Sequence, residues 1–359
     1  MTSPATTTDR YSIAFPRRWW YPVCRSDELR RQPRTVQLMD RPLALFRDGS
    51  GRPAVVLDRC AHRNAPLSLG SVQADGCLQC PYHGWRYDGD GRCTEIPGLL
   101  AEPSSRSRNV ESHAATEQDG FVWVWGEPAA APIGRPFPLP SLPRGGTVVF
   151  PCDLEATLHA ALENTLDVPH TAFLHRGIFR GTKTKELKAI RRNLDGGCEV
   201  EFVGETVGLG RLQGGPLRGK VFEHWDRFFL PSIAQVEYRI DGWLRVFNTV
   251  LHLPVSPFRT RAWFVLHWSS AVPPAVLRPI VRVRGQQVLR QDAGMLAQQS
   301  AQIRRFGGER FTSTELDLLG SAIWRLLRQA ERAEDATEAA DVPDGALDAE
   351  PEGEITFRV

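Results

Sequence analysis

The stretch RCAHRNAPLSLGSVQADGCLQCPYHGW, residues 59–85, constrains this chain more than any other feature of its sequence. It holds two mixed pairs, Cys60-x-His62 and Cys80-x-x-His83, separated by 17 residues. Two thiolates on one iron and two imidazoles on the other form the ligand set of a split 2Fe–2S cluster. A structural zinc site is the main alternative, but zinc motifs usually pair like ligands with like. We therefore predict that these four residues hold one 2Fe–2S cluster at the tips of two loops.

Length and cysteine usage restrict the class of protein. A chain of 359 residues is long enough for two domains with cores of their own. We see no apolar run that resembles a signal peptide or a transmembrane helix. Seven cysteines at irregular spacings do not suggest a secreted disulfide framework. We therefore expect a cytoplasmic protein with its thiols free for metal.

The sequence pattern changes at a proline-rich segment. Residues 15–130 contain short β-branched and aromatic runs bounded by Gly, Asp or Pro, which predicts an all-β domain. Residues 131–146 are read as a proline-rich linker or extended strap. Residues 147–330 mix helical and strand patterns and predict an α+β domain with an antiparallel sheet.

The end of the chain is strongly acidic. Residues 331–359 hold ten acidic and two basic residues, a net charge of −8. The 42 basic and 32 acidic residues of 1–330 leave that body with a net charge of +10. Few large apolar groups are available in the tail to offset its ordering entropy, so we expect it to be disordered.

A second candidate metal site lies in the segment LENTLDVPHTAFLH. Asn164, Asp167 and His170 are spaced i, i+3, i+6, which an α-helix would place on one face. His175 would lie about 140° away from His170 on an unbroken helix. Pro169 disfavours such a helix, so a break there allows both imidazoles to aim at one point.

Together the two motifs resemble the Rieske non-haem iron oxygenases, of the ring-hydroxylating α-subunit and single-subunit type. The resemblance implies an α+β fold, with an N-terminal all-β Rieske domain and a C-terminal helix-grip (START-like) catalytic domain. It implies that His170, His175 and Asp292, the acid in VLRQDAGMLAQQ, bind one Fe(II) as a 2-His-1-carboxylate triad. It also assigns catalytic roles to Asn164 and to Asp167, which bridges an iron-ligating His to a cluster His of a neighbouring subunit.

Three positions indicate which kind of Rieske domain this is. Ala65 and Tyr82 stand where respiratory Rieske domains have additional cysteines that form a disulfide. Trp85 stands where those domains have a hydroxyl residue. The resemblance therefore predicts fewer hydrogen bonds to the cluster sulfurs and a lower reduction potential.

The resemblance implies the terminal oxygenase component of a multicomponent system that uses O2. No G-x-G-x-x-G follows a strand pattern, so NAD(P)H-derived electrons are expected from a ferredoxin or a flavin-dependent reductase. The substrate is expected to be a largely apolar organic molecule that is hydroxylated, dealkylated or N-oxygenated. A homotrimer is expected and a nucleic-acid partner is not.

Two other functions are considered. The alternative is a Rieske electron-transfer protein without oxygenase activity, which would need neither the second domain nor the second metal site. Membrane association is not expected, although LRPIVRVRGQQVLR, residues 277–290, alternates Arg with apolar residues as a membrane-surface helix does.

Overall fold

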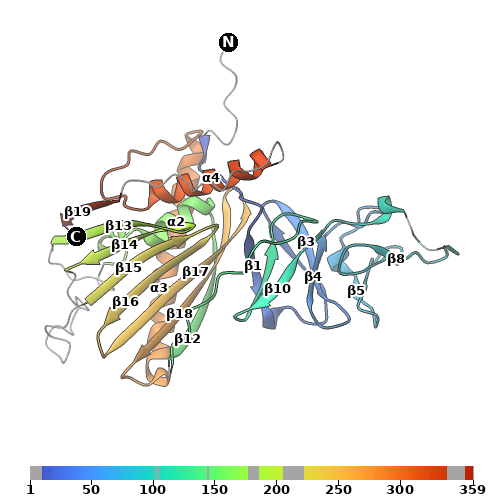
Figure 1. Ribbon diagram of the computed structural model, residues 1–359, viewed down its shortest axis with the longest axis horizontal. Coiled ribbons are helices and arrows are strands. Elements are labelled where there is room, and N and C mark those ends of the chain that lie inside the picture. Colours follow the sequence, from blue (N-terminus) through green and yellow to red (C-terminus); the bar gives the residue numbers. More distant parts are fainter. Residues whose placement is uncertain are drawn as a thin grey trace, which may run out of the picture. The chain divides into compact units, whose positions relative to one another are not determined.

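The structure is a computed structural model that describes residues 10–101, 103, 105–143, 145–176, 186–204, 222–337 and 352–358. The chain forms two compact units (Figure 1). One unit is Pro16–Pro138, and the other combines Met1–Phe15 with Leu139–Val359.

The Pro16–Pro138 unit consists of short antiparallel strands in three sheets. The first sheet contains β1 (Trp20–Arg25), β11 (Phe121–Trp125) and β10 (Ala115–Gln118). The second contains β2 (Arg34–Leu38), β3 (Arg41–Arg47), β4 (Pro53–Leu57) and β9 (Ser112–His113). The third contains β5 (Ser71–Val72), β6 (Leu78–Gln79), β7 (Arg86–Tyr87) and β8 (Cys93–Glu95).

The apolar core of this unit reaches the candidate cluster loops. Phe46 of β3 and Leu78 of β6 are fully buried in one cluster of side chains. The same cluster contains Tyr87, Cys60 and Cys80. Burial therefore anchors the two thiols to the sheets, because moving either one would open a void in a packed core.

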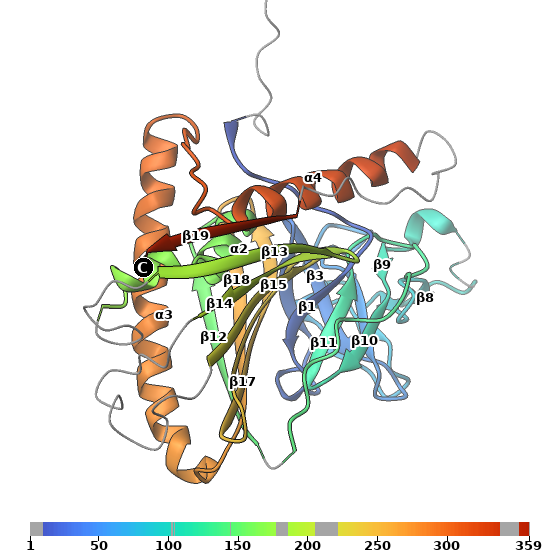
Figure 2. The same cartoon turned by 60° about the vertical axis from the view of Figure 1, so that its left-hand side comes forward.

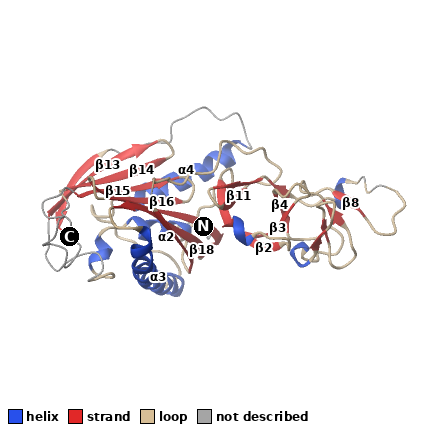
Figure 3. Ribbon diagram, turned by 90° about the horizontal axis from the view of Figure 1, so that it is seen from below, coloured by secondary structure: helices blue, strands red, loops and turns tan. Residues whose placement is uncertain are grey.

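The second unit is built on an eight-stranded sheet whose neighbouring strands are all antiparallel. In spatial order its strands are β12 (Gly146–Leu154), β18 (Arg259–Ser270), β17 (Leu244–Ser256), β16 (Ile233–Ile240), β15 (Phe222–Phe229), β14 (Gly197–Val203), β13 (Glu186–Leu194) and β19 (Gly353–Arg358). In the part of this unit that the structure describes, the long helices are α2 (Leu158–Leu166), α3 (Pro274–Arg305) and α4 (Gly320–Thr337). Figure 3 shows α2 and α3 on the same face of this sheet. The predicted α+β class with an antiparallel sheet is confirmed.

Helix α3 packs closely against one end of the sheet. Its apolar contacts to β12 and β18 come from Leu277, Val281 and Leu289. Between them stands Gly285, where a Cβ would lie 2.7 Å from the Phe150 ring, so a larger residue would push the helix away. Asp292 follows Leu289 by three positions and therefore lies on the same face of α3.

The expected boundaries of the two domains differ from those of the structure. Residues up to Pro138 stay with the first unit, because Gln118 Nε2 donates to the carbonyls of Pro136 and Phe137 at 3.0 and 3.2 Å. The proline-rich segment is thus a strap held by side-chain hydrogen bonds. The second unit also includes residues before Phe15, since Ser12 N donates to Glu309 at 2.9 Å.

The expectation of a disordered acidic tail is wrong for the parts that the structure describes. Helix α4 continues to Thr337, and Glu334 within it is buried. Strand β19 pairs with β13, which places Phe357 beside Leu187 (Figure 2). The average acidic composition conceals an alternating segment, GEITFR, whose apolar residues fall on one face of a strand. Residues 338–351 lie outside the described residues.

Replacing Phe357 by alanine should therefore destabilise the protein. The side chain is 8% exposed and packs edge-to-face on Phe202 at a centroid distance of 6.4 Å. We expect the free energy of unfolding to fall by about 3 kcal/mol, as for other buried Phe→Ala changes. Thr356→Ala, on the exposed face of the same strand, should change it by no more than about 0.5 kcal/mol. Equal stability of both variants in denaturant titrations would contradict the docked strand.

Candidate metal centres

The two cysteine–histidine loops are closed by the same hydrogen bonds. In the first, Cys60 N donates to Ala65 O at 2.9 Å and Asn64 N donates to Cys60 O at 2.9 Å. In the second, Cys80 N donates to Trp85 O at 2.8 Å and Gly84 N donates to Cys80 O at 3.2 Å. The fifth residue of each loop has positive φ, 59° at Asn64 and 72° at Gly84, a conformation that Asn and Gly tolerate best.

Each loop buries its thiol and leaves its imidazole nearer the surface. Cys60 and Cys80 are buried, and burial raises the pKa of Cys80, with the adjacent Cys60 thiol raising it further. The rings of His62 and His83 lie edge to face at a centroid distance of 4.5 Å, and His83 is exposed. Trp85 stacks on His62 at 4.8 Å and shields one side of its ring.

The donor set suits a binuclear cluster better than one zinc ion. His62 Nδ1 is buried and has no hydrogen-bond partner among the described residues, as a metal-binding nitrogen requires. The four donors do not form a group within 4.8 Å of one another, because the one such group in the described part of the chain lies elsewhere. A thiol pair beside an imidazole pair fits two irons, each with ligands of one kind.

Tyr87 is a residue of this centre that sequence reasoning missed. Its hydroxyl lies 3.3 Å from Cys60 Sγ. Burial and the contact with Cys60 raise the pKa of Tyr87, so the phenol keeps its proton and can donate to a thiolate. The prediction of fewer sulfur hydrogen bonds rested on Trp85 and did not count this contact. A tyrosine two residues after Trp85 was the available signal in the sequence.

Tyr87→Phe should lower the reduction potential of the cluster by about 20–60 mV, the equivalent of one net hydrogen bond to a group that gains negative charge. Spectroelectrochemical titration of the cluster would measure the change. Tyr82→Phe, in the neighbouring Cys80–Trp85 loop and with an exposed side chain, is the matched control and should leave the potential unchanged. Equal potentials in wild type and Tyr87→Phe would show that this hydroxyl does not bond the ligand sulfur.

The second centre forms where α2 ends. The helix stops at Leu166, and a short 3-10 helix, Pro169–Ala172, follows Asp167. The predicted break at Pro169 is confirmed, so Asn164 lies on α2 whereas Asp167 and His170 lie beyond it. His175 is in the turn after the 3-10 helix and is 1% exposed.

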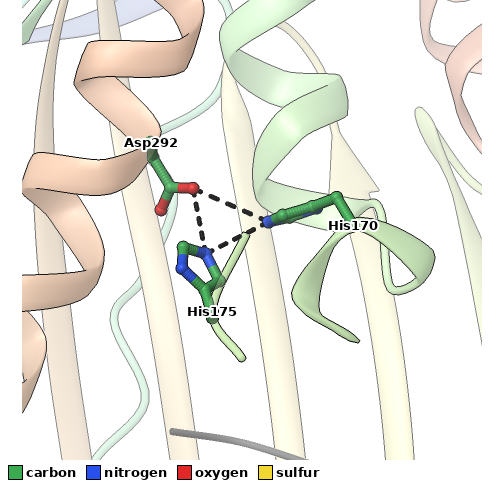
Figure 4. Close-up of side chains that lie close together, drawn as sticks. All are labelled: His170, His175 and Asp292. Carbon is green, nitrogen blue, oxygen red and sulfur yellow. Dashed lines mark hydrogen bonds and ion pairs between the residues drawn. The ribbon is translucent and has the colours of Figure 1, made fainter. Parts of the chain in front are cut away.

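Three side chains from separate elements converge here (Figure 4). His175 Nε2 lies 3.0 Å from Asp292 Oδ1 and 3.2 Å from His170 Nε2. His170 Nε2 lies 3.6 Å from the same carboxylate oxygen. One donor atom from each residue thus faces a common point, the arrangement of a 2-His-1-carboxylate site for a divalent metal.

The other nitrogen of each imidazole faces an oxygen. His170 Nδ1 lies 3.4 Å from Asp167 Oδ2, and His175 Nδ1 lies 2.9 Å from Gln291 Oε1. Burial lowers the pKa of His170, but the carboxylates of Asp167 and Asp292 outweigh it and raise that pKa to about 9. The same imidazoles lower the pKa of Asp292 against the effect of its burial. The two carboxylates beside these imidazoles thus favour a cation at the centre of the site.

Asn164 and Gln291 stand differently with respect to the sequence analysis. The side chain of Asn164 makes no hydrogen bond to the described residues, and its predicted role stays a prediction. Gln291 contacts a candidate ligand but was not singled out from the sequence, where its position next to Asp292 was the available signal.

Three of the remaining histidines serve the fold by hydrogen-bonding the backbone carbonyls of Trp125, Gly320 and Ser232: His113, His159 and His252. Burial lowers the pKa of His252 to about 4, so this residue stays neutral inside the sheet.

A cysteine–histidine cluster site and a 2-His-1-carboxylate site in one chain define a class of metalloprotein, and similarity to known protein families identifies that class. Residues 19–106 match the Rieske 2Fe-2S domain family. Residues 154–333, about half of the chain, match the family described as the vanillate O-demethylase oxygenase C-terminal domain. The chain belongs to the Rieske non-haem iron oxygenase family, whose Rieske domain implies a 2Fe–2S cluster.

Several known proteins are similar in part. The dicamba O-demethylase oxygenase component of Stenotrophomonas maltophilia is 36% identical over 174 residues, which cover 46% of this chain and 49% of that protein. Aminopyrrolnitrin oxygenase PrnD of Pseudomonas fluorescens is 39% identical over 155 residues, covering 42% and 40%. The matched segments thus span half or less of these relatives. The crystal structure of dicamba monooxygenase bound to dicamba has a TM-score of 0.74 at 24% identity, covering 90% of this chain and 99% of that one, which confirms the fold.

Proposed function

We propose that this chain is the terminal oxygenase component of a Rieske-type multicomponent system. The observation that carries the proposal is the convergence of His170, His175 and Asp292 within 3.0 to 3.6 Å in a chain that also contains a Rieske domain. An electron carrier needs no such site. The three side chains would hold one Fe(II), which when bound keeps open positions for O2.

The chain's own residues have distinct tasks in this proposal. Cys60 and Cys80 would bind one cluster iron, and His62 and His83 the other. Asp167 would accept the Nδ1 proton of its histidine neighbour in the second site, which leaves Nε2 directed at the metal.

A homotrimer is proposed as the working assembly. Large apolar side chains are exposed at both centres: Leu69 is 72% exposed and Tyr82 67% exposed at the cluster loops, and Phe173 is 85% exposed between the two iron-site histidines. Surfaces of this kind usually meet a partner. A head-to-tail ring would cover them and bring one chain's His83 to the next chain's Asp167.

The proposed reaction is hydroxylation, dealkylation or N-oxygenation of a largely apolar organic substrate. The part of the sheet facing α3 is apolar, including Val246, Phe264 and Leu266. Relatives named as an O-demethylase, a methylsterol monooxygenase and a chloroacetanilide N-alkylformylase support this range. A ferredoxin or a flavin-dependent NAD(P)H reductase is the proposed electron donor. Seven free cysteines support a cytoplasmic location.

Metal analysis separates the oxygenase from an electron carrier. Anaerobically purified protein should contain three irons and two acid-labile sulfides per chain, because the two centres share no ligand. The Fe(II) site should give a high-spin EPR signal with NO. If the protein held only two irons and two sulfides per chain after incubation with Fe(II), the mononuclear site would not bind iron and the proposal would be contradicted. Zinc in the cysteine–histidine site would contradict it as well.

Oxygen incorporation tests the reaction itself. With a reductase and NADH, a panel of aryl ethers, N-alkyl amides and aryl amines should include one that is oxidised with oxygen from ¹⁸O2. The label should appear in the N-oxygenated product of an aryl amine, or in the aldehyde released from an aryl ether or N-alkyl amide, which must be trapped before it exchanges with water. The matched control is the same assay with Asp292→Asn protein, which should give no labelled product.

A further inference from the structure

We propose that Gln291 is a positioning residue that fixes the ring orientation and tautomer of His175. This inference rests on the proposed iron site. The Nε2 atom of His175 faces His170 and Asp292. If Nε2 is to bind a metal, the single ring proton of the neutral His175 imidazole must reside on Nδ1. The amide oxygen of Gln291, 2.9 Å from Nδ1, can only accept, and it therefore favours that tautomer.

The position of Gln291 in the chain couples two ligands. It immediately precedes Asp292 on α3, so one turn of one helix supplies both a candidate ligand and the support for another. The close packing at Gly285 fixes how near this turn lies to the sheet. The two imidazoles are also supported differently, since His170 faces the carboxylate of Asp167 and His175 faces a neutral amide.

The test compares Gln291→Leu, which removes the acceptor, with Gln291→Glu, which keeps one. Fe(II) affinity of cluster-loaded, mononuclear-site-free protein would be measured by anaerobic chelator competition. We expect Gln291→Leu to bind Fe(II) about 10–100-fold more weakly, the usual effect of losing such a support. Gln291→Glu should restore at least wild-type affinity. The EPR spectrum of the NO complex should broaden in the leucine variant, because His175 is no longer held in one orientation.

Two controls separate the possible failures. Gln286→Leu, an exposed glutamine on the same helix, should leave affinity unchanged. Gln291→Asn, which is polar but too short to reach, should weaken binding even if the leucine variant fails to fold. Wild-type Fe(II) affinity in both the leucine and asparagine variants would overturn this inference but not the proposed function. Absence of Fe(II) binding in the wild type would instead overturn the proposed function.

An independent observation concerns the first half of α3. Three aliphatic side chains are exposed to solvent: Val276 by 57%, Ile280 by 58% and Val283 by 66%. At 100° per residue they lie within about 60° of one another and form a stripe along the helix. The opposite face of the same turns packs on the sheet through Leu277 and Val281. An exposed apolar stripe beyond the buried face indicates an interaction surface.

The charged residues of this helix segment are all positive. Four arginines are exposed in this segment and form no ion pair with the described residues: Arg278, Arg282, Arg284 and Arg290. No Asp or Glu occurs between Ala271 and Gln291. The described helices include none that is long and apolar enough to span a bilayer. Contrary to the expectation from the sequence, we infer that the stripe docks on an anionic lipid surface, because an exposed aliphatic stripe on a helix segment with four exposed arginines and no acidic residue suits the headgroup boundary.

Vesicle flotation with the full-length protein tests this surface. Binding to vesicles of phosphatidylglycerol and phosphatidylcholine should exceed binding to pure phosphatidylcholine, and should fall as salt rises. Ile280→Asp with Val283→Asp should abolish it, while Ile133→Asp, at an exposed position of the other unit, should not. Equal flotation of the stripe variant and wild type would overturn the inference. So would a change of oligomeric state in the stripe variant by light scattering, which would assign the stripe to a second copy of the chain.

Discussion

Asp292→Ala is expected to abolish turnover and remove the mononuclear iron while leaving the 2Fe–2S cluster at wild-type occupancy. The carboxylate supplies the negative charge of the triad, with Oδ1 3.0 Å from His175 Nε2 and 3.6 Å from His170 Nε2. Without it, two neutral imidazoles alone would have to hold a divalent cation. Iron and sulfide analysis should give two irons and two sulfides per chain, and the visible spectrum of the cluster should be unchanged.

The reverse variant completes this experiment. His83→Ala should lose the cluster's spectrum but retain Fe(II), because the two centres take no ligand in common. Asp241→Ala, whose side chain is 93% exposed, should behave as wild type in every measurement. If Asp292→Ala retained its iron and its activity, another carboxylate would have to complete the site.

Mixed trimers of His83→Ala and Asp292→Ala chains should regain activity that neither variant has alone. In the proposed ring, a chain with an intact cluster serves the intact iron site of its neighbour. Every mixed trimer, whether of 2:1 or 1:2 composition, has one competent junction of its three, so the turnover of isolated mixed trimers should approach about a third of the wild-type value.

Differential tags isolate the mixed trimers and light scattering verifies their size. A mixture of two separately purified variants that cannot exchange subunits is the control, and it should stay inactive. Mixed trimers that form and stay inactive, beside active wild-type trimers, would exclude electron transfer between subunits.

The cluster loops could be predicted from the sequence because the residues that bind the cluster lie close together in the chain. Each cysteine and its histidine lie within four residues, and each loop closes on itself through hydrogen bonds of its own backbone. The break at Pro169 was readable for the same reason, since a missing N–H and a steric conflict act on the nearest turn. The acidic tail was misjudged because composition averages over a segment, whereas a strand needs only a few alternating residues and an open sheet edge.

The sequence by itself determined the kinds of metal ligand and the local turns that present them. Tertiary structure alone decided that α3 approaches the end of α2, because that depends on how Gly285 and Leu289 pack against the sheet. The same packing brings Gln291 within 2.9 Å of His175, a contact between residues far apart in the chain that no local pattern encodes. Pairing of β19 with β13 is likewise non-local, since its stability comes from backbone hydrogen bonds and burial that exist only once the sheet has formed.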